Sequence, residues 1–159
     1  MHSRQYPCPG GTFTISTSLT SAAGCTACTA GFYCPPGSHR EFDCPPGHFC
    51  PINTADYRDS PCPAGKYNPL NRKSASGDCL DCPKGKYCPA GTSIPIDCPK
   101  GTYRDALGGD SADSSSAGGS APCTRCPGGS QCPTEGLENH ILCGPGKFSP
   151  VGSLMCFTC

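Results

Sequence analysis

The sequence predicts a small disulfide-rich repeat protein, an elongated rod of short β-hairpins and irregular loops with little or no helix. The phrase Cys-x-x-Gly-x-aromatic recurs along the whole chain, and self-similarity at this density indicates an array of small units that contact mainly their neighbours. The 159 residues include 17 cysteines, whereas Leu, Ile, Val and Phe together number only 19. Disulfides must therefore replace most of the hydrophobic core that the chain lacks.

Each copy of the phrase is expected to open one unit. In Cys82-Pro-Lys-Gly, proline at the second and glycine at the fourth position favour a type I turn, whereas Cys44-Pro-Pro-Gly favours a polyproline-like bend. The aromatic residue is expected to pack on a neighbouring disulfide; a ladder of ligand-binding rings is the alternative. The copies are Cys8–Phe13, Cys28–Tyr33, Cys44–Phe49, Cys62–Tyr67, Cys82–Tyr87, Cys98–Tyr103, Cys143–Phe148 and a weaker one, Cys126–Gln131.

The cysteine spacing alternates between short and long loops. A sequence does not fix disulfide connectivity, but pairing each cysteine with its neighbour respects every repeated length. Interlaced pairing across the Cys-x2-Cys steps remains the alternative. The neighbour pairing gives Cys8–Cys25, Cys28–Cys34, Cys44–Cys50, Cys62–Cys79, Cys82–Cys88, Cys98–Cys123, Cys126–Cys132 and Cys143–Cys156.

This pairing leaves Cys159 without a partner. Cys156-Phe-Thr-Cys159 repeats the step that opens each short-loop unit, so Cys159 is expected to bond in trans or to residues beyond this sequence. A free terminal thiol is the alternative. Residues 1–8 lack the apolar segment of a signal peptide, so the sequence is expected to be a window from a longer precursor or a processed form.

The same spacing divides the chain into consecutive units. Residues 105–121, rich in Gly, Ser and Asp, are expected to form a flexible insertion. The predicted units are residues 1–27 (long loop), 28–61 (two short loops), 62–81 (long), 82–97 (short), 98–125 (long, with the insertion), 126–142 (short) and 143–159 (long, ending in a truncated repeat).

Composition excludes several classes of function. Twelve basic and twelve acidic residues cancel without forming a block, so nucleic acid is not an expected partner, and no segment is apolar enough to span a membrane. We expect no metal, because the cysteine pairs are interleaved with cysteines that a zinc site would not use. We expect no cofactor and no enzymatic activity, because the histidines share no spacing and adjoin no nucleophile; they are His2, His39, His48 and His140.

Covalent glycans are a further expectation. The chain has no Asn-x-Ser/Thr sequon, which excludes N-glycosylation. The clustered hydroxyl residues are candidate O-glycan acceptors, namely Thr14, Ser16, Thr17, Ser18, Thr20, Ser114, Ser115 and Ser116.

The phrases Cys82-Pro-Lys-Gly-Lys-Tyr-Cys88 and Cys98-Pro-Lys-Gly-Thr-Tyr103 resemble the ephrin-receptor-like cysteine-rich repeats, which are similar in style to tumour-necrosis-factor-receptor and EGF-like modules. The resemblance covers nearly the whole chain and implies a disulfide-stapled rod in an extracellular protein. The Cys-Pro-x-Gly-x-Tyr-Cys-Pro variant is most similar to long arrays in surface and flagellar-appendage proteins of algae and other protists. No kinase or ephrin-binding segment is present, so receptor function does not carry over.

Two functions follow as expectations. The first is a non-enzymatic extracellular structural protein, a subunit or segment of a helical filament, appendage or surface coat. Here unlike ends meet head to tail in a homopolymer and the 143–159 segment packs on a neighbouring copy. The second is a ligand-binding or adhesive stalk of a cell-surface protein.

Overall fold

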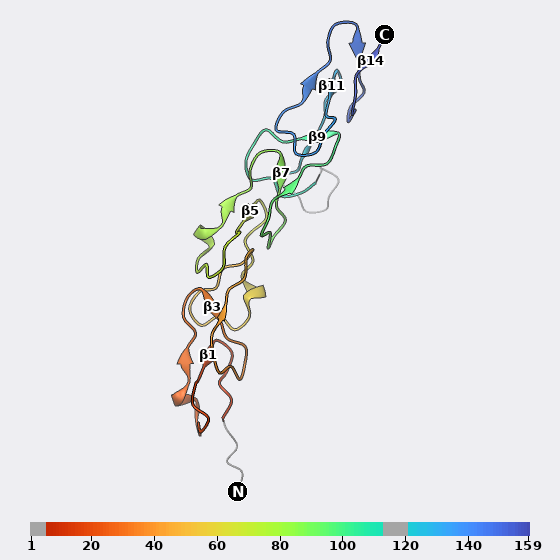
Figure 1. The fold of residues 1–159 in the computed structure, drawn as a ribbon. Coiled ribbons are helices and arrows are strands. Elements are labelled where there is room, and N and C mark those ends of the chain that lie inside the picture. The colour runs from red at the N-terminus through yellow and green to blue at the C-terminus, as the bar shows by residue number, and fades with distance from the viewer. Residues whose placement is uncertain (1–5, 113–120) are drawn as a thin grey trace. The chain divides into compact units, whose positions relative to one another are not determined.

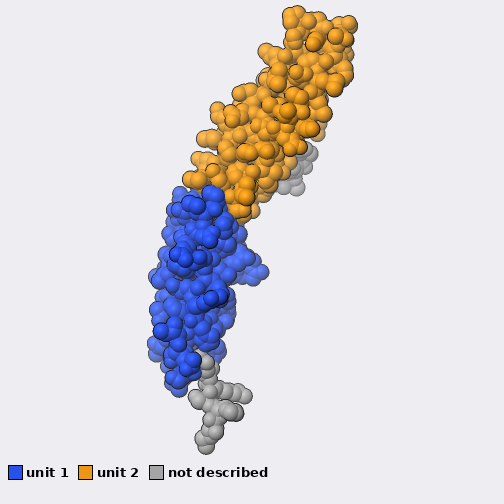
Figure 2. Space-filling view, in the orientation of Figure 1, with its two compact units in different colours: residues 1–62, 68–79 blue, residues 63–67, 80–159 orange. Residues whose placement is uncertain are grey.

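The structure is a computed structural model that describes residues 6–112 and 121–159. The chain divides into two compact units (Figure 2). The first comprises residues 1–62 and 68–79, and the second comprises residues 63–67 and 80–159. The division falls inside the predicted unit 62–81, whose residues contribute to both compact units. Below, repeats 1 to 8 are those that begin at Cys8, Cys28, Cys44, Cys62, Cys82, Cys98, Cys126 and Cys143.

The described residues form seven two-stranded antiparallel hairpins (Figure 1). In the first compact unit, β1 (Thr12–Phe13) pairs with β2 (Thr26–Ala27) and β3 (Phe32–Tyr33) with β4 (Phe42–Asp43). Repeat 3 has a single bridge, His48 to Pro61, in place of a hairpin. The second compact unit contains β5 (Lys66–Tyr67) with β6 (Leu80–Asp81), β7 (Lys86–Tyr87) with β8 (Ile96–Asp97), β9 (Thr102–Tyr103) with β10 (Thr124–Arg125), β11 (Ser130–Gln131) with β12 (Ile141–Leu142), and β13 (Lys147–Phe148) with β14 (Phe157–Thr158).

Helical structure in the described residues is limited to three single turns of 3₁₀ helix. These are η1 (Ala22–Gly24), η2 (Tyr57–Asp59) and η3 (Ser76–Asp78). Prolines and glycines divide the chain into segments of at most twelve residues, and the longest of them, residues 12–23, is rich in Ser and Thr, which disfavour an α-helix. The predicted class, a small disulfide-rich protein of hairpins and irregular loops, is confirmed.

The turn that opens each repeat lies one residue later than the sequence suggested. In repeat 5, Lys86 N–H donates to the Pro83 carbonyl at 3.3 Å, so the turn runs from residue 83 to 86. Gly85 is then its third residue, with φ +72°, which is the requirement of a type II turn and not of the expected type I turn. The expected polyproline-like bend at residues 44–47 is also wrong. His48 N–H donates to Pro45 there, and Gly47 has φ +83°.

The core consists of half-cystines. Leu, Ile and Val side chains are largely exposed, whereas the described residues bury thirteen cysteines at 4% exposure or less. Most of the aromatic residues of the phrase are half-buried beside them. The buried cysteines are Cys8, Cys28, Cys34, Cys44, Cys50, Cys62, Cys79, Cys82, Cys88, Cys98, Cys123, Cys126 and Cys132.

Candidate functional site

Sixteen cysteines form eight disulfides, in the same pairs that neighbour pairing gives. Their Cα–Cα distances run from 5.7 to 6.0 Å, within the range that an unstrained bridge requires. Four bridges close six-residue separations, in repeats 2, 3, 5 and 7. The other four close separations of 13 to 25 residues, in repeats 1, 4, 6 and 8. Cys159 is free and exposed.

The residue directly after the aromatic position distinguishes the two kinds of repeat. It is cysteine in every short-loop repeat and a polar residue in every long-loop repeat, namely Thr14, Asn68, Arg104 and Ser149. Each of these side chains makes a hydrogen bond. The Thr14 hydroxyl accepts Ser16 N–H, the Arg104 guanidinium donates to the Pro122 carbonyl at 2.7 Å, and the Ser149 hydroxyl donates to Ser130 at 2.6 Å. The polar side chain thus takes the place of the missing half-cystine.

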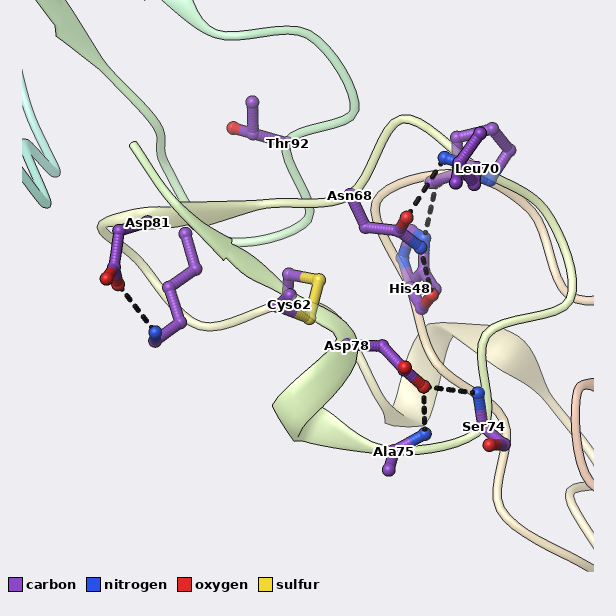
Figure 3. Close-up of a disulfide and its surroundings, with 12 residues drawn as sticks. His48, Cys62, Asn68, Leu70, Ser74, Ala75, Asp78, Asp81 and Thr92 are labelled. Atoms are coloured by element: carbon purple, nitrogen blue, oxygen red, sulfur yellow. Dashed lines mark hydrogen bonds and ion pairs between the residues drawn. A yellow bond between two sulfur atoms is a disulfide. The ribbon is translucent and has the colours of Figure 1, made fainter. Parts of the chain in front are cut away.

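Asn68 shows this substitution most clearly, because it is completely buried (Figure 3). Its Nδ2 donates to the His48 carbonyl at 3.0 Å, and its Oδ1 accepts the Leu70 N–H at 2.9 Å. The Cys62–Cys79 bridge lies beside it, and the Asp78 carboxylate accepts the N–H groups of Ser74 and Ala75 in the same loop. The loop between residues 68 and 79 is therefore fixed by side chains as well as by its bridge.

Consecutive repeats are joined by a recurring set of four backbone hydrogen bonds. At the junction of repeats 2 and 3, Gly31 N–H donates to the Cys50 carbonyl at 2.7 Å and its carbonyl accepts Cys44 N–H at 3.0 Å. Asn53 N–H donates to Cys28 at 3.0 Å, and Cys34 N–H donates to Thr54 at 2.9 Å. The same four bonds recur at three junctions of the first compact unit, between repeats 1 and 4, and at three of the second, between repeats 5 and 8. The turn glycine thus takes part in two of the four bonds at every such junction, one through its N–H and one through its carbonyl.

The turn glycines also contact the second repeat along the chain. A β-carbon on Gly31 would lie 2.6 Å from the Arg72 carbonyl oxygen of repeat 4, and one on Gly101 would lie 2.8 Å from the Gly152 oxygen of repeat 8. Gly11, Gly65 and Gly85 meet the corresponding oxygens of Asn53, Gly108 and Gly136. The expectation that units contact mainly their neighbours is therefore incomplete, because repeats 1, 2, 4, 5 and 6 also pack on the next repeat but one.

At repeat 8, one of the four junction bonds is present among the described residues. Cys159 N–H donates to the Gly146 carbonyl at 3.1 Å. At the other junctions, the first cysteine of the following repeat donates to the turn-glycine carbonyl in the same way. No described residue supplies the other partners, and nothing described lies within 4 Å of a β-carbon position on Gly129 or Gly146. Phe148 lies at this outer face of repeat 8, because it holds the aromatic position whose counterparts Tyr33 and Tyr103 contact the following repeat, and its side chain is 52% exposed. Val151 and Leu154 are also exposed but lie toward repeat 6.

The candidate O-glycan acceptors differ in accessibility. Thr17, Ser18 and Thr20 are exposed and Ser16 is half-exposed, so a glycosyltransferase could reach them in the folded chain. Thr14 is only 5% exposed, because its side chain lies at the junction with repeat 2, and this makes it a poor acceptor after folding. Ser114, Ser115 and Ser116 lie outside the described residues.

The histidines serve packing in the part of the chain that the structure describes; His2 lies outside it. His48 and His140 contact Tyr57 and Tyr103 edge to face at 5.0 and 4.9 Å between ring centroids, and His39 Nδ1 lies 3.3 Å from the Thr14 carbonyl. Within residues 6–112 and 121–159, no three His, Cys, Asp or Glu side chains gather as a metal site would require. No helix in those ranges is long and apolar enough to cross a membrane.

Comparison with known proteins gives one short match. No protein-family model matches the chain. A segment of 29 residues, 18% of the chain, is 55% identical to an ABC-type transporter, claG, of Penicillium crustosum. The match covers 4% of the transporter's length, so it is a local likeness.

Proposed function

We propose that this chain is a non-enzymatic, extracellular structural protein, a segment or subunit of a helical filament, appendage or surface coat. The observation that supports it is the recurring junction of four backbone hydrogen bonds. Such a junction depends on backbone groups and a turn glycine, so it can be extended by adding units without a new interface. Eight disulfides require an oxidising compartment, which fits an extracellular protein and the proposed kinship with ephrin-receptor-like repeats.

In this proposal the chain forms a head-to-tail homopolymer, and the 143–159 segment of one copy packs on the next. The outer face of repeat 8 offers the Cys143 carbonyl and the Gly146 N–H, which have no described partner, beside Phe148, whose side chain is 52% exposed. A second copy that covers this face would bury the apolar groups and pair the polar ones. The contact joins unlike surfaces, and a heterologous contact that does not close a ring produces a helical filament.

Electron microscopy of the purified chain tests the proposal. We expect ordered filaments of the full chain, and no filaments after deletion of residues 143–159. The earlier repeats should stay folded because each is stapled by its own bridge. Phe148→Asp should abolish filaments by placing a charge on the outer face. Ile52→Asp, at an exposed apolar residue of repeat 3, is the control and should leave them intact. Filaments that persist in Phe148→Asp or in the deletion would refute assembly through repeat 8.

Covalent O-glycans on the exposed Thr17, Ser18 and Thr20 belong to the same proposal. Their hydroxyls lie on the loop of repeat 1, away from every recurring junction bond. An intact mass of the native protein that exceeds the sequence mass in hexose or pentose steps would support them. A native mass equal to that of the oxidised polypeptide would contradict them.

A second function, a ligand-binding or adhesive stalk, has one observation in its favour. The first compact unit contains two clefts with aromatic walls, formed by repeats 2 and 3. Clefts of this kind are typical of ligand-binding proteins and are not required for the stacking of repeats.

A further inference from the structure

Two clefts lie on either side of Pro35 and Pro36 in the first compact unit. One has a volume of about 440 Å³ and is walled by Phe42, with Arg40 at its edge. The other has a volume of about 410 Å³ and is lined by Tyr33 and Tyr57. Both volumes fall in the range of ligand-binding pockets. Because the two prolines line both clefts, the clefts form one site with a rigid ridge in its middle.

The aromatic walls of this site are fixed by the local structure. Tyr33 and Phe42 are paired across the β3–β4 hairpin, and their ring centroids lie 5.6 Å apart. Tyr57 meets Tyr33 edge to face at 5.1 Å. The 3₁₀ turn η2 positions Tyr57, and the Asp56 side chain caps this turn by accepting Arg58 N–H at 2.9 Å. The aromatic rings are therefore preorganised, which lowers the entropic cost of binding a ligand.

The polar groups at the rim are mostly donors. The Arg40 guanidinium stacks over Phe42 at 4.8 Å, and no described carboxylate forms an ion pair with it. The only carboxylate among the lining residues is Asp56, and both of its oxygens accept from the Arg58 guanidinium, at 2.6 to 3.0 Å. The tyrosine hydroxyls of Tyr33 and Tyr57 add two further groups that can donate. A ligand that suits this rim must be rich in acceptors and poor in donors.

We propose that this site binds a proline-rich peptide segment in the polyproline II conformation. Proline has no N–H, and the carbonyls of a polyproline II helix point outward without internal partners, so the segment offers acceptors only. Its rings suit grooves lined by aromatic residues, and two grooves that share one wall suit two successive proline turns. A saccharide suits the rim less well, because its hydroxyls also need acceptors and the lining carboxylate is already bonded.

Fluorescence anisotropy with a labelled decaproline peptide tests this inference. The experiment uses the Phe148→Asp variant, so that the outcome does not depend on filament formation. We expect saturable binding. Arg40→Gln should weaken it about tenfold, the effect of losing one charged hydrogen bond. Lys84→Gln, which removes an exposed cation of repeat 5 that lines neither cleft, is the control and should leave the affinity unchanged.

Amide NMR shifts locate the bound peptide. Shifts confined to residues 33–42 and 55–58 would support the site, and shifts elsewhere would overturn it. Absence of decaproline binding at millimolar peptide, or equal affinity of Arg40→Gln and the parent, would also overturn it. Saturable binding of maltoheptaose that Arg40→Gln weakens, with no decaproline binding, would assign the site to saccharides instead.

Discussion

At the scale of single residues, disulfides and side-chain hydrogen bonds stabilise this fold, as a hydrophobic core does in larger domains. Cysteine or a hydrogen-bonding residue follows the aromatic position in every repeat, and Asn68 carries this role with no exposure to solvent. The alternation was visible in the sequence, because Thr14, Asn68, Arg104 and Ser149 stand where the short-loop repeats have cysteine. The bonds that these polar residues make were not visible, because they depend on which carbonyl the adjacent repeat presents.

Asp56 provides a pH-dependent test at this scale. The Arg58 guanidinium, which donates to both carboxylate oxygens, lowers the pKa of Asp56 from 3.8 to about 2. A carboxyl group whose pKa is lower in the folded than in the unfolded chain stabilises the fold above its unfolded pKa, and this contribution disappears as the pH falls through its folded pKa. The contribution of Asp56 should therefore be complete above about pH 4 and be lost towards pH 2.

Carboxyl NMR titration measures this directly. We expect a midpoint for Asp56 near 2, and a return towards 3.8 in Arg58→Gln. Asp78, whose carboxylate accepts the N–H groups of Ala75 and Ser74, also has a lowered pKa and should keep it in that variant. An Asp56 midpoint that Arg58→Gln does not move would show that the ion pair is not its cause.

At the scale of elements, short hairpins could be predicted because the recurring phrase supplies a turn and a first strand, although repeat 3 has the phrase and forms only the His48–Pro61 bridge. The turn type could not be predicted, because the proline and glycine of Cys82-Pro-Lys-Gly are compatible with a turn that starts at Cys82 and with one that starts at Pro83. The observed register places Gly85, at φ +72°, where the left-handed conformation is required. The contact between repeat n and repeat n+2 could not be predicted either. It depends on the rotation between successive repeats, which no local motif specifies.

That second-neighbour contact predicts unequal effects of the same substitution at equivalent glycines. Gly31 and Gly129 occupy the same turn position, with φ +89° and +79°, so alanine costs about 1–2 kcal/mol of backbone strain at either site. Only at Gly31 would the new β-carbon also lie 2.6 Å from a carbonyl oxygen, which adds about 1–3 kcal/mol.

Denaturant unfolding of the two variants, both made in the Phe148→Asp background so that no second copy covers Gly129, compares them. We expect Gly31→Ala to destabilise the protein clearly more than Gly129→Ala. Equal losses would mean that the backbone conformation alone requires glycine and that the contact with repeat 4 has little energetic weight.

At the scale of the whole molecule, eight short covalent loops replace a single core. The chain-entropy estimate gives about 2–3 kcal/mol for a bridge that closes a loop of this size. The neighbour pairing could be proposed from the sequence because the separations of 6 and 17 residues recur. Interlaced pairing remained open at that stage, because Cys25 and Cys28, like Cys79 and Cys82, stand only three residues apart along the chain.

Thiol counting on the denatured, unreduced protein distinguishes the two pairings. The parent chain should have one free thiol, from Cys159. Replacing both members of one bridge, Cys82→Ser with Cys88→Ser, removes no partner from any other cysteine, so the count should stay at one. Replacing Cys79 and Cys82, which belong to two different bridges, should leave Cys62 and Cys88 unpaired and raise the count to three. If the cysteines were interlaced across the Cys-x2-Cys step, the first variant would gain thiols instead. The ladder of neighbouring bridges would then have to be abandoned, because removing Cys82 and Cys88 together would have opened two bridges and not one.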